Sequence, residues 1–197
     1  MISRVQGKTL QQLGSLEAHP KLSAVERGLI RWAVIDPEDK VLDANIGTGM
    51  LAEYLRRNLQ CEVCGVSGSI EDIKRARVRL QNADIVYGGG GDIPWRENAF
   101  DAVFYQLPSA SAEAVEGSLA EIKRVLKEGG QLLLGVDGYF SAFFAPQDEE
   151  AQPLHKKRLM RILRDAGFEH IAWQRVRLCS GVMIAWKRRS ASAELSD

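Results

Sequence analysis

The sequence lacks any run of about eighteen apolar residues, so it predicts no membrane-spanning helix. It also lacks an excess of charge of either sign, because 26 basic side chains balance 26 acidic ones. Without a net field, binding to nucleic acid or to anionic lipid would need a local patch. The first sixteen residues have no continuous apolar stretch of the kind found in signal peptides. We therefore expect a cytoplasmic protein.

Cysteine and histidine are both scarce, with three residues each. Cys61 and Cys64 lie three apart in a segment that reads as a strand, so they should face opposite sides of a sheet. A redox pair needs a helix N-terminus instead, and we expect both to be buried apolar residues. His19 and His170 have no cysteine or carboxylate partners at ligand spacing. The sequence predicts no metal site.

What the sequence does have is an alternation of strand and helix patterns, which indicates an α/β fold with a mainly parallel sheet. Residues 22–189 are predicted to form one domain, preceded by an extension over 1–21 and followed by a disordered tail over 190–197. The last two strand patterns have a short connection and predict an antiparallel hairpin. The predicted strands are 40–44, 61–66, 83–87, 100–106, 131–137, 168–178 and 182–188, and the predicted helices are 23–35, 50–59, 70–82, 111–128 and 154–166.

The first strand ends at Asp43 and runs through Gly47 and Gly49 into a helix. Such a turn directs main-chain N–H groups at one point beyond the carboxyl end of the strand, where open α/β sheets bind ligands. Glycine there permits close approach and a positive φ. A purely structural tight turn is the alternative.

The segment KVLDANIGTGMLAEYL resembles the first motif of the class I S-adenosylmethionine-dependent methyltransferases, in the small-molecule branch. GVSGSIEDIKRARVRL, GDIPWRENAFDAVF, LAEIKRVLKEGGQLLLGV and LRDAGFEH extend the resemblance over roughly residues 23–187. It implies a three-layer, Rossmann-like fold whose seven-stranded sheet ends in a hairpin. It also implies S-adenosylmethionine as the cofactor. The cofactor-binding positions it implies are Asp43, Asn45, Gly47, Thr48, Gly49, Ser67, Gly89, Gly90, Asp92 and Gln106.

Three of these positions depart from the family pattern. Asn45 stands where the family usually has glycine, Ser67 where it has the acid that binds the ribose, and Gly89 where it has the acid that binds the adenine. Losing two charged acceptors should weaken binding by roughly two decades or more. Compensation could come from Gln106, from Asp72, from the backbone of Gly89 and Gly90, or from Asp92 if the glycine run lets it swing inward.

Candidate substrate residues are Tyr105, Tyr139 and His155, which could hydrogen-bond a substrate or act as a base. Tyr105 could equally be a core residue, and His155 a solvated one. The aromatic segment 139–144 could form a pocket, a lid or the interface of a homodimer. Residues 104–108 lack the Asn/Asp-Pro-Pro-aromatic signature of base-methylating enzymes, and the basic residues of 156–164 read as a solvated helix face, so a nucleic-acid substrate is disfavoured.

Two functions are therefore predicted, a small-molecule methyltransferase and a degenerate methyltransferase fold that binds or regulates a partner. A nicotinamide enzyme is a third possibility, because Gly47, Gly49 and Ala52 also fit a dinucleotide fingerprint. That fingerprint requires an acid or an arginine near position 67, and Ser67 supplies neither.

Overall fold

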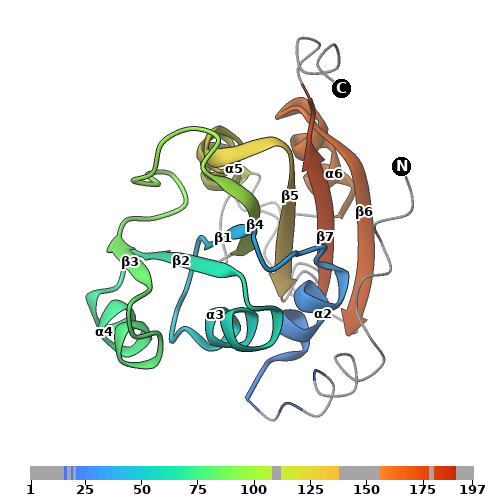
Figure 1. Ribbon diagram of the computed structural model, residues 1–197. Coiled ribbons are helices and arrows are strands. Elements are labelled where there is room, and N and C mark those ends of the chain that lie inside the picture. Colours follow the sequence, from blue (N-terminus) through green and yellow to red (C-terminus); the bar gives the residue numbers. More distant parts are fainter. Residues whose placement is uncertain are drawn as a thin grey trace, which may run out of the picture.

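The computed structural model describes Leu16, His19 and residues 21–107, 112–137, 156–177 and 180–189. These ranges form one seven-stranded sheet in the order β3-β2-β1-β4-β5-β7-β6 (Figure 1). The first five strands along the chain run parallel, and β7 pairs antiparallel with both β5 and β6. The predicted mainly parallel sheet with its closing hairpin is confirmed. The strands are β1 Lys40–Asp43, β2 Glu62–Ser67, β3 Asp84–Tyr87, β4 Phe100–Gln106, β5 Leu126–Asp137, β6 Phe168–Arg177 and β7 Ser180–Lys187.

Helices cover both faces of the sheet and give three layers (Figure 1). On one face, Leu29, Leu55 and Ile73 belong to a core that includes Val41 and Val63 of the strands. On the other face, a second core joins the buried residues of two more helices to the strands. The first face carries α2 Ala24–Trp32, α3 Met50–Tyr54, the π-helix η1 Leu55–Leu59 and α4 Ile70–Arg79, and the second carries α5 Ala112–Val125 and α6 Lys156–Asp165.

Helix α2 begins as its sequence predicts. The Ser23 hydroxyl accepts from the Glu26 amide at 3.1 Å, and the Glu26 carboxylate accepts from the Ser23 amide at 2.6 Å, which completes a capping box. Its predicted end, at residue 35, is wrong. The helix ends at Trp32 because Ala33 adopts an extended backbone with ψ 135°.

The end of α5 also differs from the prediction. The sequence predicts a helix over 111–128, but the helix ends at Val125 and β5 begins at Leu126. Gly129, with φ +73°, instead lies inside β5, where the register with β4 jumps from Phe100↔Leu126 to Ala102↔Gln131. The glycine therefore serves a bulge in the sheet rather than a helix cap.

Cys61 and Cys64 are both buried and free, and they belong to the cores on opposite faces of the sheet. Burial raises the pKa of each thiol to about 11, so both stay protonated at neutral pH. The prediction of two buried apolar cysteines is confirmed, whereas Cys179 lies outside the described residues.

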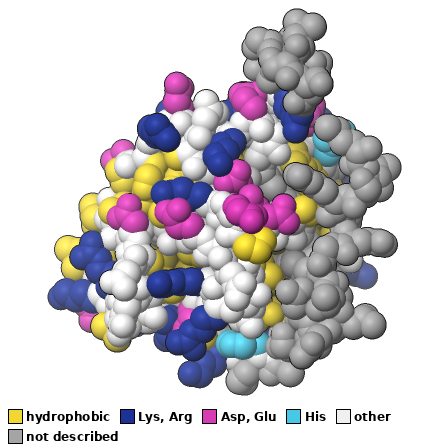
Figure 2. Space-filling model, viewed as in Figure 1, with side chains coloured by type: hydrophobic (Ala, Val, Ile, Leu, Met, Phe, Trp, Pro, Cys, Tyr) yellow, Lys and Arg dark blue, Asp and Glu magenta, His cyan; other side chains and the backbone are white. Residues whose placement is uncertain are grey.

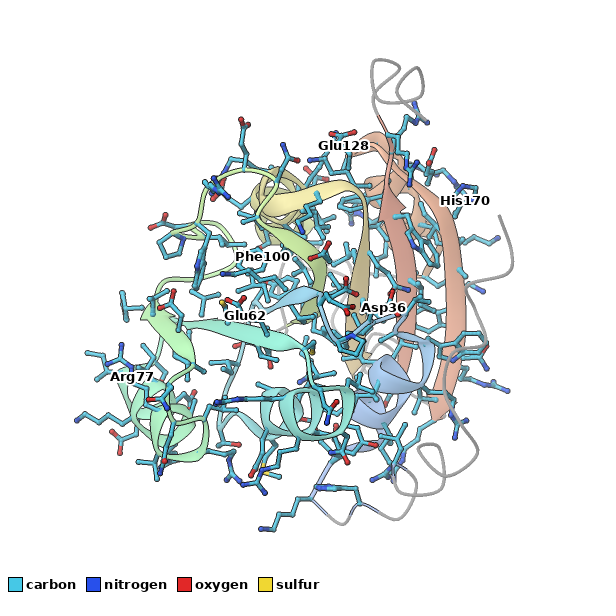
Figure 3. The ribbon with its side chains drawn as sticks, viewed as in Figure 1. Asp36, Glu62, Arg77, Phe100, Glu128 and His170 are labelled. Carbon is cyan, nitrogen blue, oxygen red and sulfur yellow. The ribbon has the colours of Figure 1, made fainter. Side chains whose placement is uncertain are left out.

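The outer strand β3 is protected by α4. Arg77, labelled in Figure 3, donates to the Ile85 carbonyl from Nε at 3.2 Å and from a terminal nitrogen at 2.6 Å. This contact satisfies a main-chain acceptor of an edge strand.

Within the described ranges, no helix combines the length and apolar composition that crossing a bilayer requires.

Candidate cofactor site

The turn from Asp43 to Gly49 lies at the carboxyl end of β1, between the ends of β2 and β4. The Ala44 amide donates to the Phe104 carbonyl of β4 at 2.8 Å, and the Ile46 amide donates to the Val66 carbonyl of β2 at 3.0 Å. Each neighbouring strand therefore anchors one residue of the turn. This is the edge at which a parallel sheet presents its ligand site.

Gly47 and Gly49 both have positive φ, at +48° and +77°, but their surroundings differ. A Cβ at Gly47 would meet no atom within 4 Å, so this part of the turn borders open space. The Gly49 amide donates to the Ile46 carbonyl at 2.8 Å, whereas the Gly47 and Thr48 amides find no acceptor among the described residues. The turn thus leaves two main-chain donors for a ligand beside an open space.

Asp43 is fully buried at the start of this turn. Its Oδ1 accepts weakly from the Asn45 amide at 3.4 Å, while its Oδ2 has no partner among the described residues. Burial raises the pKa of this carboxyl to about 7, against the lowering effect of the Asn45 contact. An incompletely satisfied carboxyl here would favour a cationic or hydrogen-bond-donating ligand.

Asn45 and Gln106, two of the predicted cofactor-binding residues, lie next to each other. The Asn45 side-chain amide donates to the Gln106 carbonyl at 3.2 Å, which joins the turn to the end of β4. Asn45, which stands where the family usually has glycine, therefore ties the turn to β4. The residue is exposed and is not packed into the turn.

Ser67 ends β2 and is buried, with 4% of its surface exposed. Its hydroxyl oxygen accepts from the Ser69 amide at 3.1 Å, and the Ser69 hydroxyl in turn caps α4 by accepting from the Asp72 amide at 3.3 Å. The Ser67 hydroxyl keeps its proton for one donated bond. Asp72 is thereby placed in the first turn of α4.

The glycine run 88–91 forms a tight turn rather than a loose loop. Gly89 and Asp92 exchange backbone hydrogen bonds at 3.3 and 3.0 Å. The Asp92 side chain is exposed. The hydrogen bond to Glu121 is the main cause that raises the pKa of the Arg124 guanidinium, and the Asp92 charge adds a smaller contribution. The backbone pairing opposes the inward swing considered for Asp92.

Gly90 lies directly against the end of β4 and α5. A Cβ at this position would stand 2.6 Å from the Ser118 hydroxyl and 2.7 Å from the Tyr105 hydroxyl. Those two hydroxyls are themselves 3.1 Å apart and hydrogen-bonded. Tyr105 is 5% exposed, so the structure places it in the core of this face, beneath Gly90.

Sequence reasoning missed the clamp that holds the segment between β3 and β4. Arg124 of α5 donates to the carbonyls of Ile93 and Trp95 at 2.8 and 2.7 Å, and Glu121 accepts from the Ile93 amide at 3.1 Å. The ion pair with Arg124 lowers the pKa of Glu121 to about 2. The signal was the Glu-x-x-Arg spacing on a helix, which pairs the two side chains.

Two exposed apolar residues at the same edge were also missed. Tyr87 ends β3 directly beside Ser67 in the β2–β3 register, and Ile70 begins α4. They are 66% and 62% exposed, which is unusual for apolar side chains of this size. Their signal was position, since Tyr87 ends a strand at the ligand edge and Ile70 follows three residues after the end of β2.

Tyr139, His155 and the aromatic segment 139–144 lie outside the described residues. Their roles remain predictions. The described ranges hold no group of three or more His, Cys, Asp or Glu side chains arranged to bind a metal ion.

Comparison with known proteins gives this geometry a family context. Residues 42–134 match a family model described as a methyltransferase domain. The demethylmenaquinone methyltransferase of Thermotoga maritima is 31% identical over 101 residues, which cover 51% of this chain and 44% of that protein. Across the quinone-biosynthesis methyltransferases it matches, the chain covers 40–52% of their length.

Solved structures share the fold at lower identity. The PH0226 protein from Pyrococcus horikoshii superposes with a TM-score of 0.73 at 18% identity, covering 95% of this chain and 96% of that one. The [4+2]-cyclase SpnF superposes with a TM-score of 0.70 at 20% identity, covering 84% and 80%. The architecture is therefore shared with proteins of more than one named activity.

Proposed function

Because the chain belongs to the class I S-adenosylmethionine-dependent methyltransferase family, we propose that it binds S-adenosylmethionine at Asp43–Gly49 and methylates a small molecule. The observation that carries the proposal is the open space beside Gly47, which borders two main-chain donors that no described residue uses. The cofactor, when bound, supplies a methyl group activated by a sulfonium centre.

The residues at the turn fit such a cofactor. Asp43 holds a buried carboxyl with one unpartnered oxygen at the start of the turn, and Gly47 leaves room for the ligand. Asn45 ties the turn to β4 through Gln106, so the main-chain donors are held in place before the ligand arrives. Such alignment supplies most of the catalysis that an in-line methyl displacement needs.

The part of the proposed site that would hold the nucleoside has fewer hydrogen-bonding groups than the family pattern. The Ser67 hydroxyl can donate one bond to a ribose oxygen, and the Gly89 and Gly90 backbone can face the base, but neither position supplies a carboxylate. Exposed Tyr87 and Ile70 at the same edge offer apolar surface that a purine could cover. We expect affinity to come from the turn and from apolar contact more than from charged acceptors.

The methyl acceptor is proposed to be a small molecule rather than a nucleic acid. The Tyr105 hydroxyl is already bonded to Ser118, so Tyr105 is proposed to shape the pocket floor rather than to take a proton. Tyr139 and His155 remain the proposed substrate-facing residues, and a homodimer through the aromatic segment 139–144 remains proposed as well.

Calorimetry with S-adenosylhomocysteine tests the proposal. We expect saturable binding in the micromolar range, about 7–8 kcal/mol of binding free energy. Gly47→Val should abolish it by filling the open space with the fold intact, as circular dichroism would check. No heat at millimolar ligand, or unchanged affinity in Gly47→Val, would contradict the placement.

A second candidate is a degenerate methyltransferase fold that binds or regulates a partner without using the cofactor. The missing carboxylates at Ser67 and Gly89 favour it. Restoring them by Ser67→Asp and Gly89→Asp should be tolerated at position 89, where a Cβ meets nothing within 4 Å. If the native chain binds no S-adenosylhomocysteine and the double variant does, this second function replaces the first.

A further inference from the structure

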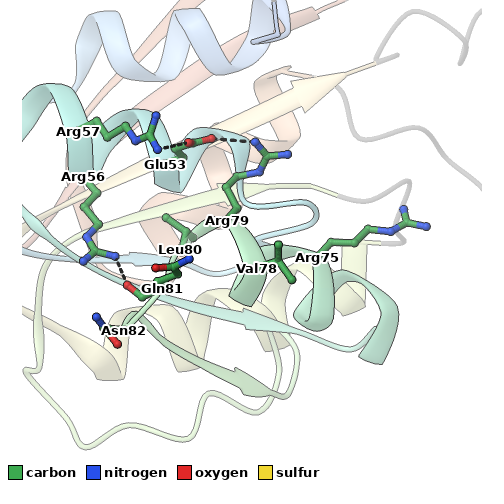
Figure 4. Close-up of a pocket in the computed structure, with 9 residues that line it drawn as sticks. All are labelled: Glu53, Arg56, Arg57, Arg75, Val78, Arg79, Leu80, Gln81 and Asn82. Carbon is green, nitrogen blue, oxygen red and sulfur yellow. Dashed lines mark hydrogen bonds and ion pairs between the residues drawn. The ribbon is translucent and has the colours of Figure 1, made fainter.

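A groove of about 690 Å³ lies between α3–η1 and α4 (Figure 4). One wall is formed by residues at helical spacing on α3 and η1, and the other by residues at the same spacing on α4. Basic side chains gather in the lower part of the view in Figure 2, where Figure 1 places α3 and α4. The lining residues are Glu53, Arg56, Arg57, Arg75, Val78, Arg79, Leu80, Gln81 and Asn82.

The residues that line this groove carry an excess of positive charge. Four arginines face one carboxylate, so three positive charges are uncompensated among the lining residues. Arg56 uses its guanidinium on a main-chain acceptor, the Gln81 carbonyl at 2.6 Å, and Arg75 is exposed without an ion-pair partner in the described part of the chain. The whole chain is neutral, so this local excess is a property of the groove.

Glu53 shows which chemistry these arginines recognise. One of its oxygens lies 3.1 Å from Arg57 and the other 2.8 Å from Arg79, so a single carboxylate draws in two guanidinium groups (Figure 4). The side chain of Arg57 is nevertheless 73% exposed, which leaves most of its donors free. Arginine's planar fork suits further carboxylates at the same place.

An apolar side chain stands among the charges. Val78 is 79% exposed on the groove wall, one helical turn from Arg75 and next to Arg79. A bare polyanion gains nothing from such a residue, whereas a peptide carrying an aliphatic side chain between acidic ones would cover it. Among the described residues, no aromatic side chain lines the groove, so these residues offer no surface on which nucleic-acid bases could stack.

We propose that this groove, the arginine groove, binds an acidic peptide segment of a partner protein. Carboxylates of the segment pair with Arg56, Arg57 and Arg75, and an aliphatic side chain covers Val78. The site also reaches the glycine turn, because Arg79 donates from Nε to the Thr48 carbonyl at 3.0 Å while holding Glu53.

The test uses the full chain without cofactor, so its result is independent of the proposed activity. A fluorescein-labelled peptide with six glutamates and two leucines is titrated by anisotropy at low salt and at 0.3 M salt. We expect a dissociation constant below about 0.1 mM at low salt and clear weakening at high salt. A peptide with glutamine at every glutamate should bind at least tenfold more weakly.

Matched variants locate the binding. Arg57→Gln with Arg75→Gln should weaken the acidic peptide roughly tenfold, because both are exposed and Arg75 has no ion-pair partner among the described residues. Lys157→Gln with Arg158→Gln removes the same charge from exposed positions of α6 and should leave affinity unchanged. Val78→Asn should weaken the leucine-containing peptide but not one with serine in place of leucine.

Three outcomes would overturn the proposal. The first is no saturable binding of the acidic peptide at low salt. The second is equal loss in the α6 variant, which would mean unspecific charge attraction. The third is tighter binding of a single-stranded oligonucleotide of equal charge, which would assign the groove to nucleic acid. Thermal unfolding of each variant confirms that the folded chain is being compared.

Discussion

Gly49 lies so close to Ala76 of α4 that a Cβ at position 49 would stand 3.2 Å from both the Cα and the Cβ of Ala76. The same Cβ would lie 3.2 Å from a methyl group of Leu80. The second glycine of the turn is therefore required by the packing of α4 onto the start of α3. The first glycine, Gly47, borders open space instead.

Gly49→Ala should lower the free energy of unfolding by about 2–5 kcal/mol. The positive φ of +77° costs a residue with a Cβ about 1–2 kcal/mol, and overpacking against Ala76 adds about 1–3 kcal/mol. Urea unfolding measures the loss. Gly47→Ala is the control, since it bears only the backbone cost at φ +48° and should lose about 1–2 kcal/mol. Equal losses in the two variants would contradict the packing role.

The sequence predicted most of the fold because buried strands and the helices that cover them each have a recognisable pattern of apolar residues. Strands buried on both faces read as apolar runs, and helices such as α2 carry their start signal in Ser23 and Glu26. Element ends were less predictable where the sheet decides them. Val125 ends α5 early because Leu126 pairs with Phe100, a partner 26 residues away in the chain.

The candidate site was predicted unevenly for a similar reason. Asp43, Gly47 and Gly49 are local to one turn, so their sequence pattern was enough to identify them. The contact of Gly90 with Tyr105 and Ser118 joins three separate segments, and no spacing rule connects them. The unpartnered oxygen of Asp43 depends on the whole surrounding core and is visible only in three dimensions.

Asp43→Asn should change how stability depends on pH. Burial raises the pKa of Asp43 from 3.8 to about 7, so the folded protein holds a proton that the unfolded chain releases. The native state is therefore favoured below pH 4, loses this advantage as the pH rises toward 7, and is at its least favoured above 7. Between pH 4 and pH 7, ionisation of Asp43 should lower the free energy of unfolding by about 4 kcal/mol.

Asparagine keeps the acceptor for the Asn45 amide but cannot ionise. The variant should therefore gain stability relative to the native chain between pH 4 and pH 7 and keep that gain at pH 8. Urea unfolding measures the free energy of unfolding of both proteins at pH 5 and at pH 8. Subtracting the native value from the variant value at each pH cancels the contributions of other titrating groups, such as Asp39. A difference that does not change with pH would mean that Asp43 is ionised throughout.

A double-mutant cycle tests the contact beneath the glycine run. Gly90→Ala should destabilise the native chain by about 1–3 kcal/mol, because its Cβ would stand 2.6 Å from the Ser118 hydroxyl and 2.7 Å from the Tyr105 hydroxyl. In a background of Tyr105→Phe and Ser118→Ala both hydroxyls are absent, and the cost should fall by about 1 kcal/mol or more. Gly91→Ala, where a Cβ meets nothing within 4 Å, is the matched control. An equal cost of Gly90→Ala in both backgrounds would show that the strain lies elsewhere.

Arg124→Met should loosen the segment between β3 and β4 more than it lowers global stability. The arginine donates to the Ile93 and Trp95 carbonyls and pairs with Glu121, whose pKa it holds at about 2. Losing these bonds at a partly exposed position should cost about 1–2 kcal/mol. Methionine retains the aliphatic stem, so the change isolates the guanidinium.

Hydrogen exchange distinguishes this local effect from general unfolding. The amides of Gly89, Asp92 and Trp95 should lose protection in Arg124→Met, while those of β1 and β4 keep theirs. The native clamp should also weaken in acid, because Glu121 stabilises it when ionised and that contribution disappears as the pH falls from 4.5 toward 2. If Arg124→Met leaves the protection of residues 89–95 unchanged at neutral pH, the contacts of Arg124 are not what orders the glycine run 88–91.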